Sequence, residues 1–124
     1  MRWWLFAVAR AGTPVGDGLL TRYASEGAAA PDAARGAALW AKKFPAADGS
    51  GERSCTTCHG ATLGAAGKHA TTGEPIEPMT APGRLTDPEK IEKWFGRNCR
   101  WTVGRDCTPG EKADLLLYLS HGGV

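Results

Sequence analysis

A short segment near the middle of the chain combines two cysteines with a histidine. The segment is Cys55-Thr56-Thr57-Cys58-His59, which has the spacing C-x-x-C-H. This is the attachment signature of c-type haem, in which two thiols add to the haem vinyl groups and the histidine supplies the proximal iron ligand. Two intervening residues let both sulfur atoms reach neighbouring vinyl groups, and the adjacent histidine can turn its imidazole beneath the iron. We therefore expect one covalent haem c per chain, held by Cys55, Cys58 and His59.

Two other kinds of site use the same residue types. A thioredoxin-like C-x-x-C follows a strand in a βαβ unit, and no such pattern surrounds Cys55. A zinc site could combine Cys55 and Cys58 with Cys99 and Cys107, the other two cysteines. Seven residues separate Cys99 from Cys107, whereas paired zinc thiolates usually have two to four residues between them. The spacing therefore favours a haem attachment site over a thioredoxin-like site and over a zinc site.

The first residues of the chain are typical of an export signal. Met1-Arg2 is a short basic start, the run from Trp3 to Ala9 is apolar, and Ala9-Arg10-Ala11 fits the small-residue pattern of a cleavage site. We expect residues 1–11 to be a signal peptide remnant, with an amphipathic first helix as the alternative. Export to the periplasm agrees with haem attachment outside the cytoplasm. In that oxidising compartment, the close pair Cys99 and Cys107 is expected to form a disulfide.

Length and composition limit the class of protein. A chain of 124 residues is one domain, and its 17 glycines and 8 prolines are about a fifth of the residues, which indicates many loops. Such a domain has a thin apolar core and needs a disulfide, a metal or a large cofactor. The net charge of +2 gives no basic footprint for nucleic acid, and no run of 18 apolar residues could span a membrane.

Capping and periodicity predict four helices and no convincing strand. The first extends from Asp17 to Gly27, and the second starts at the N-cap Asp32 and continues to about Phe44, with Leu39 and Trp40 near one face. Asp87-Pro88 opens a third helix at 89–98, with Ile91, Trp94 and Phe95 inward. Thr108-Pro109-Gly110-Glu111 is a capping box that opens the last helix, with Leu115, Leu116, Tyr118 and Leu119 buried and Gly122-Gly123 at its end.

These helices predict an all-α fold. The long loop 45–82 contains the C-x-x-C-H motif and has little periodicity, which is typical of a segment that wraps a cofactor. Gly36 and Tyr118 are suitable contacts for the crossing of the helices before and after the motif in class I cytochromes c. We expect a single domain at 12–124 with the class I cytochrome c fold, in which four or five short helices and long loops surround one covalent haem.

The residues alone leave the second axial ligand open. Met79 follows Pro78, a familiar setting for a distal methionine, but it is only 20 residues past His59. His69 is nearer still, and His121 lies at the end of the last helix. Asn98, 39 residues past His59, can equally be a helix C-cap, because asparagine tolerates the left-handed conformation.

Several segments resemble the sphaeroides haem protein type of monohaem class I cytochrome c. They are Lys93-Trp94-Phe95-Gly96-Arg97-Asn98-Cys99, the segment 104–112, the segment 72–78 and the C-x-x-C-H motif, so the resemblance covers roughly residues 32 to 120. It implies that His59 is the proximal ligand, that Asn98 is the distal ligand, and that a Cys99–Cys107 disulfide pins the ligand loop. Met79 departs from the non-ligating aliphatic residue expected at its position in that family.

The resemblance also implies a function. An amide ligand that is released on reduction would free the iron for O₂, NO or CO, and the protein would exchange electrons with a dihaem cytochrome c and a membrane cytochrome b. We identify no acid/base pair or nucleophile near the motif, so we expect a carrier or gas-binding protein and not an enzyme. The alternative is an ordinary periplasmic electron carrier with Met79 as the ligand.

Overall fold

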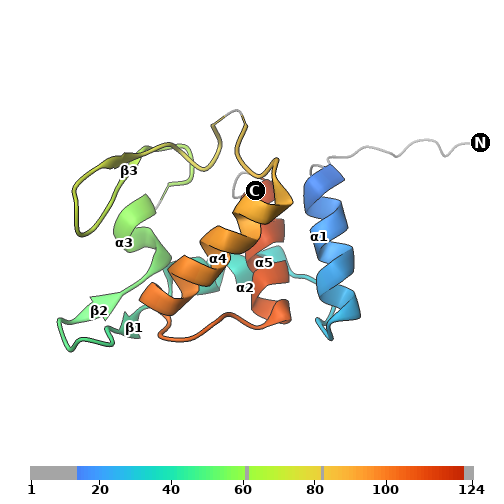
Figure 1. Ribbon diagram of the computed structural model, residues 1–124, viewed down its shortest axis with the longest axis horizontal. Helices are drawn as coiled ribbons and strands as arrows, with labels where there is room; N and C mark the ends of the chain where they lie inside the picture. Colours follow the sequence, from blue (N-terminus) through green and yellow to red (C-terminus); the bar gives the residue numbers. More distant parts are fainter. Residues whose placement is uncertain (1–13, 61, 82, 122–124) are drawn as a thin grey trace, which may run out of the picture.

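The computed structural model describes residues 14–60, 62–81 and 83–121. The expected signal segment 1–11 and the expected helix stop at Gly122-Gly123 lie outside these residues. Within them, helices make up most of the regular structure, as the sequence predicted: α1 (Pro14–Ser25), α2 (Ala33–Ala41), α3 (Cys55–His59), α4 (Pro88–Thr102) and α5 (Pro109–Ser120). Figure 1 shows α1 on the opposite side of the molecule from α3.

Two short antiparallel pairs of strands brace the long loop, where the sequence predicted no strand. In the first, β1 (Phe44–Pro45) pairs with β2 (Glu52–Arg53), and in the second β3 (Gly67–Lys68) pairs with β4 (Pro75–Ile76). Each strand has only two residues, so no alternation of apolar and polar side chains could reveal it. The pairs lie before and after α3 in the chain and hold the loop around it.

Side-chain caps start three of the helices as the sequence predicted. The Asp32 carboxylate accepts hydrogen bonds from the first backbone N–H groups of α2. The Asp87 carboxylate does the same for α4, where Pro88 occupies the first turn. Thr108 and Glu111 form the capping box of α5. These bonds satisfy N–H groups that a helix start otherwise leaves without partners.

The helix ends differ from the predicted ones. Helix α1 begins at Pro14 and ends at Ser25, earlier than expected, and α2 ends at Ala41, so that Phe44 belongs to β1. Helix α4 continues past Asn98 to Thr102, and its C-cap is Val103. Burial explains the continuation, because Cys99 and Thr102 are both buried in the last turn.

Helices α2 and α5 cross at Gly36. A Cβ atom at Gly36 would be 2.1 Å from the Asp114 carbonyl oxygen and 2.9 Å from the Tyr118 Cβ. The missing side chain therefore allows the two backbones to touch, which is the Gly36 and Tyr118 contact that the sequence predicted. The Asp114 carboxylate fastens the crossing, since it accepts hydrogen bonds from the Asp32 N–H and the Arg35 guanidinium.

Two apolar clusters fill the interior on either side of α5. The first cluster joins α1, α4 and α5, and its buried members are Leu19, Tyr23, Ile91, Ala113 and Leu116. The second cluster joins α2, α5 and the loop after α3, and its buried members are Trp40, Leu63, Leu115 and Leu119. Trp94, which was expected to point inward, is 47% exposed and belongs to neither cluster, but it lines the cavity described below. Tyr118 is only half-buried. Within the described residues, no helix is both long and apolar enough to cross a membrane.

Candidate functional site

The C-x-x-C-H motif forms its own short helix, α3. Ser54 precedes it in an extended conformation, and the Ser54 N–H donates to the Thr57 hydroxyl at 2.9 Å. Gly60 ends the helix with a φ of 75°, which a glycine adopts without strain. The structure therefore places Cys55, Cys58 and His59 together on one turn and a half of helix.

The β3–β4 pair packs directly on the backbone of this helix. A Cβ atom at Gly67 would be 2.2 Å from the Cys58 carbonyl oxygen and 2.9 Å from the His59 Cα. Only glycine allows this approach, so Gly67 fixes the distance between the loop and the backbone that carries His59. The sequence analysis did not identify this residue, and a glycine in a glycine-rich loop gives no signal of its own.

A cavity of about 920 Å³ lies beside α3. Its walls come from α2, α3, α4, α5 and the loop 69–87, and the members that carry the argument below are Cys55, Cys58, His59, Met79, Arg84 and Asn98. The volume is near the upper end of the range for small-molecule and cofactor sites. All the haem-site residues predicted from the sequence therefore face one cavity.

Burial changes the pKa of two side chains of α3. Cys55 and Cys58 are both free thiols, and burial raises the pKa of Cys55 to about 11, so this thiol is neutral at pH 7. Burial, with a smaller contribution from the Arg84 guanidinium, lowers the pKa of His59. The His59 imidazole is therefore neutral at pH 7 and has a lone pair for a metal.

Trp40 and Met79 belong to the apolar part of the cavity wall. The Trp40 and His59 ring centroids are 5.0 Å apart, and Met79 and Cys55 pack against the cluster of Trp40, Leu63, Leu115 and Leu119. The Trp40 indole Nε1 is buried with no hydrogen-bond partner among the described residues. Arg84 holds the chain around Met79, because its guanidinium donates to the carbonyl oxygens of Glu77 and Pro78.

Asn98 belongs to a different wall of the cavity, formed by α4. It is inside the helix, so the alternative that it is a C-cap is wrong. The side chain is exposed in the protein alone, and its carboxamide makes no hydrogen bond within the described residues. A free amide on an otherwise regular helix can therefore serve a ligand in the cavity.

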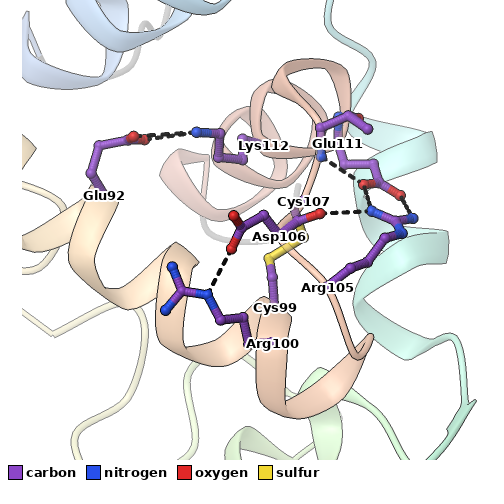
Figure 2. Close-up of a disulfide and its surroundings, with 9 residues drawn as sticks. Glu92, Cys99, Arg100, Arg105, Asp106, Cys107, Glu111 and Lys112 are labelled. Carbon is purple, nitrogen blue, oxygen red and sulfur yellow. Dashed lines mark hydrogen bonds and ion pairs between the residues drawn. A yellow bond between two sulfur atoms is a disulfide. The ribbon is translucent and has the colours of Figure 1, made fainter.

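The expected disulfide between Cys99 and Cys107 follows Asn98 directly and joins α4 to the start of α5 (Figure 2). Both cysteines are buried. Arg105 donates two hydrogen bonds to the Glu111 carboxylate, at 2.8 and 3.0 Å, and Glu111 accepts from the Thr108 N–H. The turn that carries Cys107 is thereby fixed to α5, and through the disulfide it fixes the last turn of α4.

The disulfide excludes the four-cysteine zinc site, because Cys99 and Cys107 are bonded to each other and cannot bind a metal as thiolates. Within the described ranges, no group of three or more histidine, cysteine, aspartate or glutamate side chains could hold a metal ion. His69 lines the cavity, but its Nδ1 accepts hydrogen bonds from the Thr71 and Thr72 N–H groups. The Nδ1 lone pair is therefore already used within its own loop.

Comparison with known proteins supports the interpretation of this site. Residues 26–119 match a family described as a domain of unknown function (DUF1924), to which the chain belongs. The cytochrome c-type protein SHP of Cereibacter sphaeroides is 47% identical over 107 residues, which cover 82% of this chain and 80% of the relative. The chain is a member of the sphaeroides haem protein family. The resemblance seen in the sequence is confirmed.

Solved structures confirm the fold of this cytochrome. The structure of oxidised SHP, described as an oxygen-binding cytochrome c, has a TM-score of 0.76 and 44% identity, and the match covers 86% of this chain and 96% of that one. The solution structure of cytochrome c'' from Methylophilus methylotrophus, a study of haem-ligand detachment, has a TM-score of 0.74 and 30% identity, with 88% and 94% covered.

The residues of the cytochrome fit the haem that membership of this family implies. Two free thiols and a neutral imidazole lie on one helix and face one cavity, and the apolar side chains of Leu39, Leu115 and Leu119 line it. The Arg84 guanidinium lines the same cavity and would offer a cation to a haem carboxylate. This donor set matches the chemistry of c-type haem.

Proposed function

We propose that Cys55 and Cys58 attach one haem c covalently, with His59 as its proximal ligand and Asn98 as its distal ligand. When bound, the haem supplies a redox-active iron and a coordination position for a diatomic gas. The proposed function is electron transfer combined with gas binding, in a single cytochrome c domain at 12–124. The observation that carries it is the unbonded Asn98 carboxamide, which faces the same cavity as His59 from a separate helix.

The surroundings of Asn98 favour it over Met79 as the distal ligand, because Met79 is packed in an apolar cluster whereas the Asn98 carboxamide has no hydrogen-bond partner among the described residues. That cluster contains Trp40, whose ring lies against the His59 imidazole. Asn98 comes from a separate helix, α4, and the neighbouring disulfide limits its movement.

The amide of Asn98 would respond to the oxidation state of the iron. A carboxamide oxygen is a hard ligand, and ferric iron is harder than ferrous iron. Asn98 would therefore hold oxidised iron more strongly than reduced iron, and its release on reduction would leave a position for O₂, NO or CO. The description of SHP as oxygen-binding and the study of haem-ligand detachment in cytochrome c'' support this behaviour in relatives.

We further propose that residues 1–11 are a signal peptide remnant and that the protein acts in the periplasm. The disulfide next to Asn98 supports an oxidising compartment. The proposed redox partners are a dihaem cytochrome c and a membrane cytochrome b, together with diatomic gases as ligands. The proposed activity is that of a carrier, without turnover of a substrate.

Substitution of the two candidate ligands tests the proposal. Asn98→Ala should leave haem attachment intact, because α3 is unchanged, and should convert the ferric iron to a five-coordinate or water-ligated high-spin form. Met79→Leu is the matched control and should leave the absorption spectrum almost unchanged. The reduced wild-type protein should bind CO readily.

The opposite result supports the alternative function. If Met79→Leu removes the low-spin ferric spectrum and Asn98→Ala has no effect, the protein is a Met79-ligated electron carrier. A reduced wild-type protein that stays six-coordinate and does not bind CO also contradicts the gas-binding proposal.

A further inference from the structure

Helix α4 is fixed to the rest of the protein near its two ends. Near its start, Ile91 is buried in the cluster with α1 and α5, and near its end Cys99 is bonded to Cys107. Between these points, Trp94 and Asn98 line the cavity. The place of Asn98 relative to His59 therefore depends on how firmly both ends of α4 are held.

Glu92 ties the first part of α4 to two other helices. Its carboxylate accepts a hydrogen bond from the Tyr23 hydroxyl of α1 and bonds from the Lys112 ammonium of α5 at 3.2 and 3.4 Å (Figure 2 shows the Lys112 bonds). Arg22 of α1 adds an ion pair at 3.5 Å. Glu92 does not line the cavity, so it holds α4 from the side away from the candidate haem site.

The bonds to Glu92 are shielded from water. The side chains of Glu92 and Lys112 are only 23% and 17% exposed, and Tyr23 is fully buried. Burial alone would raise the pKa of Glu92, but the hydrogen bonds from Tyr23 and Lys112, together with the charges of Lys112 and Arg22, outweigh it and hold the pKa below the usual value. Charge-assisted hydrogen bonds of this kind are about twice as strong as neutral ones. The carboxylate is therefore a firm and directional anchor.

The anchor is connected to the cavity in two ways. A helix rises about 1.5 Å per residue, so Asn98 lies about 9 Å from Glu92 along one continuous helix. The Tyr23 ring also meets the Phe95 ring edge-on, with centroids 6.5 Å apart, and Phe95 lines the cavity. A shift or rotation of α4 at Glu92 would therefore move Asn98.

We propose that Glu92 is a positioning residue for Asn98, and that its bonds to Tyr23 and Lys112 set the strength of the distal amide ligand in the ferric protein. This inference rests on the proposed role of Asn98. Loss of the Glu92 charge leaves the haem-attachment helix unchanged but loosens α4. Exogenous ligands then compete more successfully with the Asn98 amide.

Imidazole binding to the ferric, haem-loaded protein tests the inference. Glu92→Gln should raise the imidazole affinity by roughly fivefold or more, the lower end of typical couplings between sites. Glu26→Gln is the matched control and should leave the affinity unchanged, because the ion pair that Glu26 makes among the described residues is with Arg22, on the surface of the same region. Tyr23→Phe keeps the carboxylate and its Lys112 bonds, and should give a smaller increase in the same direction. CO affinity of the reduced protein should be the same in all these variants.

Combination with Asn98→Ala separates the possible failures. If Glu92 acts through Asn98, Glu92→Gln adds nothing to the imidazole affinity of Asn98→Ala, whereas additive effects overturn the inference. Unchanged affinity in Glu92→Gln, with an increase in Asn98→Ala, also overturns it and leaves the proposed function standing. No increase in Asn98→Ala contradicts the proposed function itself.

Discussion

Replacement of Gly67 by alanine tests whether the loop holds the proximal side of the site. Gly67 is not at a positive φ, so alanine fits its backbone conformation and the change acts only through space. The new Cβ would be 2.2 Å from the Cys58 carbonyl oxygen, whereas ordinary contacts begin at 3.4 Å. The loop and α3 must therefore separate by roughly 1.2 Å, and overpacking of this kind typically costs about 1–3 kcal/mol.

The expected result is a lower midpoint of thermal unfolding. For a domain of this size, the cost corresponds to a decrease of roughly 5–10 °C. The measurement is circular dichroism of the haem-loaded protein during heating, with the absorption spectrum recorded in parallel. The spectrum should change as well, because the displaced backbone carries His59.

Gly64→Ala is the matched control within the same loop. Gly64 also has no positive φ, and among the described residues a Cβ there would meet the Thr80 hydroxyl alone, at 3.8 Å. Its unfolding midpoint should stay within about 2 °C of the wild type, as for most surface substitutions. If Gly67→Ala unfolds at the same temperature as Gly64→Ala and has an unchanged spectrum, the close contact does not position His59.

Three further predictions concern the helices and the disulfide. Gly36→Ala should destabilise by about 3 kcal/mol in urea unfolding, because its Cβ would be 2.1 Å from a carbonyl oxygen of α5, whereas Gly18→Ala in open space on α1 should be neutral or stabilising. The Arg105 hydrogen bond is the main cause that lowers the pKa of Glu111 to about 2. The stabilisation of the folded state by this pair is therefore complete above pH 4.5 and is lost as the pH falls towards 2. Since the Glu111 side chain is 25% exposed, we expect roughly 1–2 kcal/mol, and Arg105→Gln should flatten the fall of the unfolding midpoint between pH 5 and 2.5. Replacement of both cysteines of the Cys99–Cys107 bridge by serine should cost about 2.5 kcal/mol, measured by urea unfolding, on the chain-entropy model.

Local chemistry explains which parts of the fold could be predicted. The caps Asp32, Asp87 and Thr108 act on backbone groups within three residues, so the sequence next to each was sufficient. The C-x-x-C-H motif is likewise a local pattern, and its three side chains share one short helix. The Gly36 crossing was found because the fold class demanded a small residue there.

Long-range contacts explain what the sequence did not reveal. Helix α4 was expected to stop at Asn98, but the last turn continues because Cys99 and Thr102 are buried against other elements. The Arg53 guanidinium lies 4.2 Å from the Trp101 ring centroid and joins the strand before α3 to α4, across residues far apart in the chain. The bonds of Glu92 to α1 and α5 are also long-range contacts, and no short sequence motif predicts them.

The position of the disulfide also affects how the four cysteines are oxidised during maturation. Cys99 and Cys107 are 8 residues apart, whereas Cys58 and Cys99 are separated by 41. Loop-closure entropy in an unfolded chain therefore favours the local pair over that crossed pair by about 1.4 kcal/mol, or roughly tenfold. Once the local bridge has formed, Cys55 and Cys58 have only each other as a partner within the chain. A reductant that prepares the protein for haem attachment then has one possible disulfide, Cys55–Cys58, to keep reduced.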